Sequence, residues 1–172
     1  SLGGNAIALA AGANHSCALL ESGELRCWGR SLFGALGTGV PGDVGDNELP
    51  SDVAPVELSA TPIAVTAGSS HTCVAFATGD VQCFGLAASG QLGYGNERNI
   101  GDNELPSEAG VVDIGLRVLE IDAGAFHTCV VVDTAEVRCW GKGSLGQLGY
   151  GSTADVGDSE VPASVGSVAL GQ

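Results

Sequence analysis

The segment AAGANHSCALLESGELRCWG, residues 10–29, recurs twice in altered form along the chain, and the architecture follows from this repetition. Its histidine and its two cysteines recur at intervals of 56 residues, as His15, His71 and His127, as Cys17, Cys73 and Cys129, and as Cys27, Cys83 and Cys139. A fixed period of this length is typical of proteins in which each repeat is one small structural unit stacked on its neighbours. We therefore divide the chain into three repeats, at about residues 5–60, 61–116 and 117–172.

Each repeat predicts one strand followed by a hairpin. In the first repeat, residues 7–12 are mostly apolar and end at a glycine, as a short buried strand does. Residues 15–20 and 24–28 then flank a turn that contains Gly23, which suits a three-residue hairpin loop with a left-handed glycine. In that register the two cysteines of the repeat lie opposite each other.

The remainder of the repeat is less regular. The third hairpin turn has Ala135 where the other two have glycine, so we expect a strained or different turn there. A weak strand is expected around residues 56–58. Because no segment of about ten or more residues shows a helical period, we predict an all-β fold.

The composition excludes several classes of partner. The 172 residues include 28 glycines, and 20 acidic side chains oppose 6 basic ones, for a net charge of −14. This excess of carboxylates excludes the attraction to phosphate backbones on which nucleic-acid binding rests, and it disfavours anionic membranes. With 44 % hydrophobic residues the chain is apolar enough to fold. No apolar run is long enough to span a bilayer. From the charge and the lack of such a run, we expect neither a nucleic acid nor a membrane as partner.

These residues resemble the repeat of the regulator of chromosome condensation family. The shared pattern is alanine-glycine, histidine, a glycine turn, tryptophan-glycine and a glycine-leucine-glycine loop, here GALGTG at residues 34–39 and GQLGYG at residues 90–95 and 146–151. The resemblance implies a β-propeller with one four-stranded blade per repeat. Departures from the family pattern are the two cysteines per repeat, Phe84 in place of tryptophan, and the acidic GDNELP segment. This variant is similar to secreted bacterial repeat proteins.

Three blades raise the question of closure. Propellers close with about four to eight blades, and each blade buries its faces only against its neighbours. We predict that two chains meet head to tail in a six-bladed homodimeric ring, since the chain begins and ends at the same phase of the repeat. The alternative is that these residues belong to a longer array.

The cysteines are expected to form disulfides. Repeat symmetry and the hairpin register together select the pairs Cys17–Cys27, Cys73–Cys83 and Cys129–Cys139. Each bond would close a loop of about eleven residues and contribute roughly 2–3 kcal/mol in the chain-entropy model. Disulfides indicate an oxidising compartment, so we expect a secreted or periplasmic protein. A metal site at His15 and the cysteines of its repeat is disfavoured, because a fourth ligand is not evident.

The repeated histidines and aromatic residues are expected to be structural. They are His15, His71 and His127, and Trp28, Phe84 and Trp140. Catalytic residues usually break a repeat, whereas these obey it; we expect the histidines to bond the backbone of a loop and the aromatic rings to pack between blades. No serine or free cysteine stands beside a histidine and an orienting acid in a convincing pattern, so we expect no enzyme and no cofactor.

The acidic loop of each repeat is the one chemically suggestive element. Closely spaced carboxylates are hard oxygen ligands of the kind that calcium selects. The candidates are Asp43, Asp46 and Glu48, then Asp102 and Glu104 with Asn99, then Asp155, Asp158 and Glu160. Turn formation, with the aspartate side chain capping backbone amides, explains the same pattern without a metal and is favoured.

Three functions from different classes remain open. A secreted protein-binding or scaffold module with an unidentified protein partner is favoured, because the resemblance implies relatives that bind proteins. A glycan-binding propeller with one shallow site per blade is the alternative. Guanine-nucleotide exchange, the activity of the family's founding member, is the least expected, since an exported protein would not meet a cytosolic GTPase.

Overall fold

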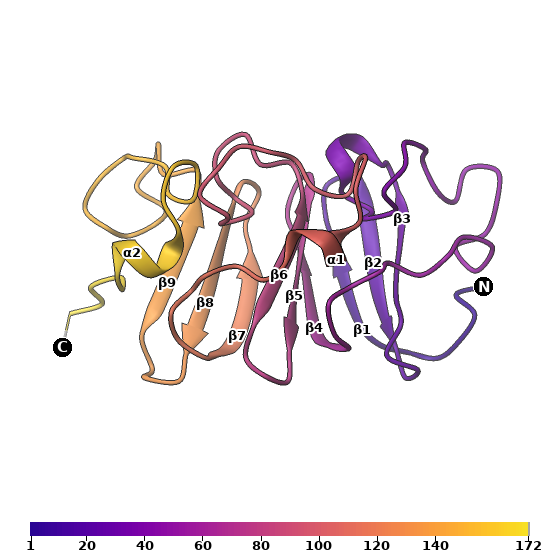
Figure 1. Cartoon of the computed structure of the whole chain (residues 1–172), viewed down its shortest axis with the longest axis horizontal. Helices are drawn as coiled ribbons and strands as arrows, with labels where there is room; N and C mark the ends of the chain where they lie inside the picture. Colours follow the sequence, from indigo (N-terminus) through magenta and orange to yellow (C-terminus); the bar gives the residue numbers. More distant parts are fainter. Residues whose placement is uncertain (172) are drawn as a thin grey trace.

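The computed structural model describes residues 1–171 and consists of three small antiparallel sheets side by side (Figure 1). Gln172, the last residue of the third expected repeat, lies outside the described residues. The strands follow sequence order within each sheet: β1 (Ala6–Ala11), β2 (His15–Leu20) and β3 (Leu25–Gly29), then β4 (Pro62–Ala67), β5 (His71–Phe76) and β6 (Val81–Gly85), then β7 (Val118–Ala123), β8 (His127–Val132) and β9 (Val137–Gly141). The predicted all-β repeat is confirmed.

In the part of the chain that the structure describes, helical structure is confined to short turns, namely η1 (Leu32–Gly34), α1 (Pro106–Ala109) and α2 (Pro162–Val165). Both α-helices start at a proline, whose fixed φ suits the first helical position. Within residues 1–171 no helix has the length and apolar character needed to cross a membrane. In Figure 1 the tight hairpin turns lie along the lower edge of the stack, and η1 and the long loops that follow the third strands lie along the upper edge.

The hairpins have the predicted register. Cys17 lies opposite Cys27 and Leu19 lies opposite Leu25. Gly23, in the turn between these strands, has a φ of 86°. The third turn is strained as predicted, because Ala135 has a φ of 62°, in the left-handed region that side chains with a Cβ rarely adopt.

Replacing Ala135 by glycine is expected to raise the free energy of unfolding. A left-handed alanine costs about 1–2 kcal/mol, which glycine avoids. Glycine also has more freedom in the unfolded chain, which lowers the free energy of unfolding by about 0.4–1 kcal/mol. The net increase in the free energy of unfolding is therefore about 0.5–1 kcal/mol. Urea unfolding measures this difference. The opposite substitution, Gly79→Ala, provides the comparison: Gly79 has a φ of 90°, and a Cβ there would also lie 2.2 Å from Cγ of Arg117. A stabilising Gly79→Ala or a destabilising Ala135→Gly would contradict this reading.

The fourth strand that the family pattern implies is replaced by separate contacts on the outer edge of the third strand. In the second blade, Gly85 pairs with Ile100 in an isolated bridge. Further along the same edge, the hydroxyl of Tyr94 donates to the carbonyl of Cys83 and accepts from its N–H, both at 3.2 Å. One tyrosine hydroxyl thus satisfies the backbone groups that a regular fourth strand would pair.

The weak strand predicted around residues 56–58 is not formed. The N–H of Val56 does bond the carbonyl of Leu25, at 2.8 Å. Pro55 has no N–H to donate, and the next carbonyl, that of Glu57, turns to the following blade, where it accepts from Ser107 at 3.1 Å. This segment therefore links blades instead of extending a sheet.

Glycines set the distance between neighbouring blades. A Cβ on Gly34 would lie 2.5 Å from the carbonyl oxygen of Ile100, and a Cβ on Gly90 would lie 2.3 Å from the backbone nitrogen of Asp158. The glycine loops of the first and second blades therefore rest directly on the acidic loop of the blade that follows. Residues without a side chain are needed at these points of close backbone approach.

Candidate interaction site

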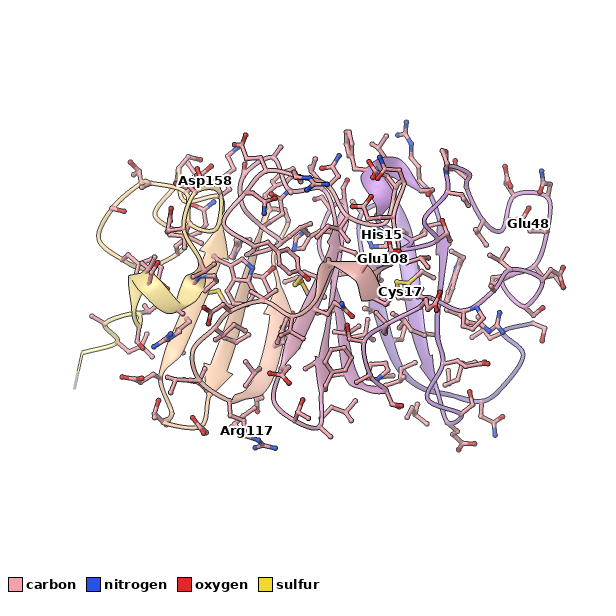
Figure 2. All side chains as sticks on the ribbon, viewed as in Figure 1. His15, Cys17, Glu48, Glu108, Arg117 and Asp158 are labelled. Carbon is pink, nitrogen blue, oxygen red and sulfur yellow. A yellow bond between two sulfur atoms is a disulfide. The ribbon has the colours of Figure 1, made fainter. Side chains whose placement is uncertain are left out.

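The cysteines form three disulfides, each across one hairpin, in the pairs selected from the sequence: Cys17–Cys27, Cys73–Cys83 and Cys129–Cys139. No free cysteine is present among residues 1–171. The metal site considered for His15 and its two neighbouring cysteines is therefore wrong, because both sulfurs are used in a disulfide. Figure 2 shows His15 next to Cys17, inside the stack of sheets.

The histidines join neighbouring blades. Nε2 of His15 lies 2.8 Å from Oγ1 of Thr72, and Nε2 of His71 lies 3.1 Å from Oγ1 of Thr128. Each threonine hydroxyl in turn donates to a loop carbonyl of the preceding blade. Since the hydroxyl proton is used there, the histidine Nε2–H is the donor to the threonine. The histidines thus bond a threonine of the next blade and not, as expected, a loop backbone.

Burial keeps the central histidine neutral. His71 is completely buried, and this burial, with smaller contributions from the charges of His15 and His127, lowers its pKa to about 4. Burial also lowers the pKa of His15. Gly68 leaves room for the ring of His71, since a Cβ on that glycine would lie 2.1 Å from the ring carbon Cε1. A neutral, enclosed imidazole fits the predicted structural role.

Lowering the pH is expected to destabilise the wild type more steeply than a His71→Gln variant. The pKa of His71 is about 6.5 in the unfolded chain and about 4 in the folded protein. Between these values only the unfolded state takes up the proton, so stability present above pH 6.5 is lost towards pH 4, at about 1.4 kcal/mol per pH unit. Urea unfolding at several pH values measures the two slopes, and parallel slopes would contradict the assignment.

The aromatic positions lie between blades, as expected for packing residues. Phe84 and Trp140 are completely buried. A Cβ on Gly37 would lie 2.8 Å from the ring of Phe84, so this ring packs on the glycine loop of the preceding blade. Trp28 is only partly buried, because no blade of the described chain precedes the first one.

The structure gives no support to the calcium sites considered for the acidic loops. Asp43 accepts from the N–H of Ser31 at 2.8 Å, and Asp155 accepts from the N–H of Gly143 at 2.7 Å. These bonds cap turns, as in the interpretation without a metal that the sequence favours. In the described part of the chain, no three histidine, cysteine, aspartate or glutamate side chains lie close enough to hold a metal ion. The structure thus gives no support to the other candidate ligands, Asp46, Glu48, Asp102, Glu104, Asp158 and Glu160.

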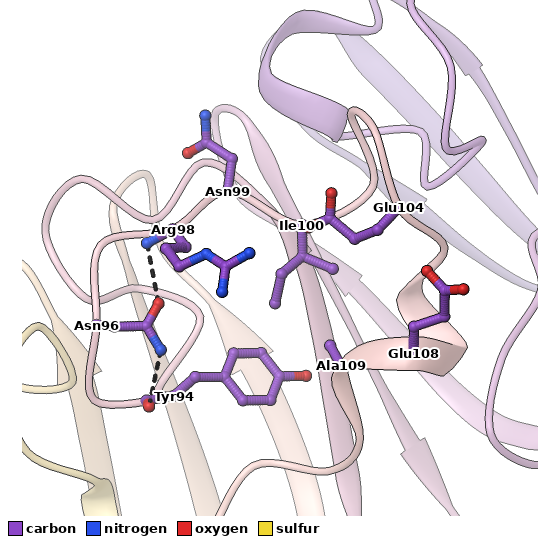
Figure 3. A pocket seen from close by; sticks show the side chains of 8 residues that line it. All are labelled: Tyr94, Asn96, Arg98, Asn99, Ile100, Glu104, Glu108 and Ala109. Carbon is purple, nitrogen blue, oxygen red and sulfur yellow. Dashed lines mark hydrogen bonds between the residues drawn. The ribbon is translucent and has the colours of Figure 1, made fainter.

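A hollow of about 490 Å³ lies beside α1 in the second blade (Figure 3). Tyr94, Ile100 and Ala109 provide its apolar lining. Tyr94 is held in place because its hydroxyl also lies 3.2 Å from the carbonyl oxygen of Gly110, so its single proton is shared between that carbonyl and the carbonyl of Cys83. Burial raises the pKa of Tyr94 to about 12, so the hydroxyl stays protonated and this wall of the hollow is uncharged at neutral pH.

Charges of both signs line the same hollow. Figure 3 shows Arg98 on one side and the carboxylates of Glu104 and Glu108 on the other. Glu108 accepts from the N–H of Leu105 at 3.2 Å. The Oε2 atom of Glu104 is buried and has no hydrogen-bond partner. Arg98 forms no ion pair within residues 1–171. The guanidinium of Arg98 is therefore free of an ion pair, and the carboxylate of Glu104, which lines the hollow, has one oxygen without a hydrogen-bond donor.

The lining of this hollow departs from the repeat. Arg98 stands where the first blade has Gly42 and the third has Ala154. Two other hollows lie against the hairpin turns of Gly23 and Gly79, and these are copies of each other one repeat apart, so they follow from the fold itself. Sequence reasoning missed the site beside α1. One feature of the sequence could have indicated it: Arg98 is one of only six basic residues, and the equivalent positions of the other two repeats are not basic.

The repeats match a known family model. The description of the model is Regulator of chromosome condensation (RCC1) repeat, and the matched segments are residues 6–35, 63–91 and 118–147, each of which overlaps all three strands of one sheet. The chain belongs to this family. The resemblance found in the sequence is thereby confirmed.

Curated relatives with RCC1-like sequences are much longer than this chain. The X-linked retinitis pigmentosa GTPase regulator homolog of Caenorhabditis elegans is 32 % identical over 148 residues, and the ultraviolet-B receptor UVR8 of Arabidopsis thaliana is 30 % identical over 154 residues. These alignments cover 86 % and 87 % of this chain but 10 % and 32 % of the relatives. The chain thus spans about a third or less of their length.

Solved RCC1-type structures share the fold. The crystal structure of Prp20p from Saccharomyces cerevisiae, described with its binding to Gsp1p and histones, superimposes with a TM-score of 0.70 at 20 % identity. The match covers 91 % of this chain and 38 % of that one. The structure of human WBSCR16 superimposes with a TM-score of 0.69 at 21 % identity. The three sheets are accordingly blades of an RCC1-type propeller.

Proposed function

We propose that the protein is a protein-binding module and that the hollow beside α1 receives a basic side chain of its partner. The observation that carries the proposal is the unpartnered, buried Oε2 atom of Glu104 at the edge of this hollow. A buried carboxylate oxygen without a donor is unfavourable, and a hydrogen bond from a cationic group relieves this cost. A lysine or arginine would bring its charge to Glu104 and lay its alkyl stem on Tyr94 and Ile100.

The overall charge supports a basic partner. A net charge of −14 on 172 residues attracts positively charged surfaces over long range, which raises association rates and makes them sensitive to salt. Arg98, on the opposite side of the hollow, offers donors to a backbone carbonyl or carboxylate of the same partner segment. The two kinds of charge would thus orient the segment as well as attract it.

The family relationship supports a protein as the partner. Yeast RCC1 (Prp20) is described in a complex with Kap60, and Prp20p with its binding to Gsp1p and histones. We extend to this chain only the use of the propeller as a protein-binding surface. We further propose that it acts without catalysis and in an oxidising compartment outside the cytosol, as the three disulfides indicate. Guanine-nucleotide exchange does not fit that location.

A peptide array tests the proposal against the glycan alternative. The array holds peptides with single and paired lysines or arginines, each next to a copy with glutamine in place of the basic residue, and a glycan array is probed with the same labelled protein. We expect basic peptides to bind, their glutamine copies to fail, and binding to weaken as salt rises. Avid glycan binding without peptide binding would reject the proposal in favour of a lectin.

A further inference from the structure

The loop that follows β3 in the first blade exposes two large apolar side chains next to each other. Leu32 exposes 37 % of its surface and Phe33 exposes 40 %. The position of Phe33 is taken by Ser89 in the second blade and by Leu145 in the third. Apolar surface that the chain does not cover is a candidate contact for a partner when it adjoins a binding site.

The substitution of a glutamine by alanine accounts for the different shape of this loop. In the second and third blades, a glutamine side chain accepts from the N–H two residues before it: Gln91 from Ser89 at 2.9 Å, and Gln147 from Leu145 at 2.8 Å. Ala35, the equivalent residue of the first blade, has no such acceptor. The loop there forms the short helix η1 instead.

The backbone of η1 is strained at the exposed aromatic residue. Phe33 has a φ of 60° and a ψ of 22°, in the left-handed region. This conformation is a genuine outlier for a bulky side chain. Apart from Ala135, no other non-glycine residue of the described chain has a positive φ. Strained residues concentrate where proteins bind their ligands, so η1 is a candidate contact on a second ground.

The loop with η1 lies against the segment that lines the hollow beside α1. A Cβ on Gly34 would lie 2.5 Å from the carbonyl oxygen of Ile100, which lines the hollow. Further along, the N–H of Gly39 bonds the carbonyl of Gly101 at 3.1 Å, and a Cβ on Gly39 would lie 3.4 Å from the carbonyl oxygen of Glu104. The first blade therefore borders the hollow, and Figure 3 shows its pale purple ribbon beside Ile100 and Glu104.

Two departures from the repeat thus meet where the first and second blades join. Arg98 gives the hollow a basic residue that the other blades lack, and η1 replaces the glutamine-bonded loop of the other blades. Residues that only pack blades together, such as Phe84 and Trp140, keep their place in the repeat and are completely buried. The two departures instead form one exposed surface with charges in the hollow and apolar side chains at η1.

We infer that the partner segment carries an apolar side chain close to its basic one, and that η1 receives the apolar side chain while the hollow receives the basic one. This inference rests on the proposed function, because it adds a second contact to the same site. The two side chains are separated by a few residues, since an extended chain advances about 3.3 Å per residue and the two surfaces adjoin.

Charge and polarity together select this occupant. The net charge of −14 attracts a cationic segment and disfavours an anionic membrane, so the apolar side chains of η1 have a protein segment as their partner. A leucine laid on Phe33 and Leu32 would remove apolar surface from water, which favours binding. This contact is insensitive to salt, whereas the contact between a basic side chain and Glu104 weakens as salt rises.

Fluorescence anisotropy with defined peptides tests the inference. The peptides consist of serine and glycine with one arginine and one leucine, in either order and with one to four residues between them. Each has one copy with serine in place of leucine and one with glutamine in place of arginine. We expect one spacing to bind about fivefold or more tighter than its serine copy, as burial of part of a leucine predicts. This preference should persist as salt rises.

Variants of the loop assign the leucine contact to η1. Asparagine and glycine both tolerate the left-handed backbone, so Phe33→Asn and Phe33→Gly remove the ring and keep the loop. The matched control is Leu145→Asn, at the same position of the third blade, where the leucine is 89 % exposed. We expect both Phe33 variants to bind the leucine peptide and its serine copy nearly equally, and Leu145→Asn to keep the wild-type preference. Circular dichroism confirms folding.

The outcomes separate this inference from the proposed function. Serine copies that bind the wild type as tightly as the leucine peptides at every spacing, while glutamine copies fail, would overturn the contact at η1 and leave the hollow as a basic-residue site. A leucine preference that survives in both folded Phe33 variants would also overturn the contact at η1. Glutamine copies that bind as tightly as the arginine peptides, or no binding by any peptide, would overturn the proposed function and this inference together.

Discussion

Gly90→Ala is expected to lower the free energy of unfolding by about 1.5–4 kcal/mol, since a left-handed alanine has a net cost of about 0.5–1 kcal/mol and overpacking adds about 1–3 kcal/mol. Gly90 has a φ of 72°, and a Cβ there would lie 2.3 Å from the backbone nitrogen of Asp158 and 2.6 Å from the carbonyl oxygen of Val156. These are backbone atoms of the third blade. The clash is relieved only if the second and third blades move apart.

Gly95→Ala is the matched control for this prediction. Gly95 lies in the same loop with a φ of 68°, but its Cβ would meet no atom closer than 3.4 Å, an ordinary contact. We expect this variant to lose only the net cost of a left-handed alanine, about 0.5–1 kcal/mol once the smaller freedom of alanine in the unfolded chain is counted. Urea unfolding followed by circular dichroism measures both. Equal losses in the two variants would contradict the close packing of blades at Gly90.

Reduction of the disulfides is expected to destabilise the protein strongly. Each bond joins cysteines 10 positions apart, and a loop of that size contributes roughly 2–3 kcal/mol by restricting the unfolded chain. Folded domains have a total stability of about 5–15 kcal/mol, so the loss of three such bonds removes a large share of it. Urea unfolding with and without a reducing agent measures the sum.

Removing one pair of cysteines measures how much a single disulfide contributes to stability. The variant with both Cys73→Ala and Cys83→Ala removes the central disulfide and should lose about 2–3 kcal/mol, and more if a cavity remains. Peptide mapping without reduction is the companion measurement, and it should recover only pairs within a repeat. Disulfide pairs between repeats, or a stability that reduction does not change, would contradict the claim that each hairpin is stabilised by its own disulfide.

The features that the sequence predicts well are local to one repeat. The two-residue alternation in a hairpin and the position of Gly23 determine the register, and the register places Cys17 opposite Cys27. The strained turn at Ala135 follows from the same comparison of repeats. These features depend on residues close together in the chain, so pattern and turn chemistry are sufficient to predict them.

The features that the sequence does not reveal arise between distant segments. The partner of His15 is Thr72 of the next blade, 57 positions away, and no local pattern pairs the two. The replacement of a fourth strand by the hydroxyl of Tyr94 depends on how a loop folds back over Cys83. The structure gives the calcium hypothesis no support for the related reason that carboxylates close in sequence need not lie close in space: that of Asp43 accepts from a backbone amide, the N–H of Ser31.

The hollow beside α1 has one residue that the sequence singles out and one that it does not. Arg98 stands out in a comparison of the repeats, because its equivalents are Gly42 and Ala154. Glu104 does not stand out, since every repeat has glutamate at that position. What distinguishes it is the burial of its Oε2 atom without a hydrogen-bond partner, which only the three-dimensional structure shows.

The binding role of Glu104 is tested most directly by titrating the best basic peptide from the array into three proteins in a calorimeter. These are the wild type, Glu104→Gln, and Glu160→Gln, the equivalent change in the third blade, where the carboxylate accepts from the hydroxyl of Ser159 at 2.8 Å. We predict that Glu104→Gln weakens binding about tenfold or more, as the loss of a buried charge pair does, and that Glu160→Gln changes it by less than about twofold. Equal effects of the two substitutions, or unchanged binding in Glu104→Gln, would contradict the account.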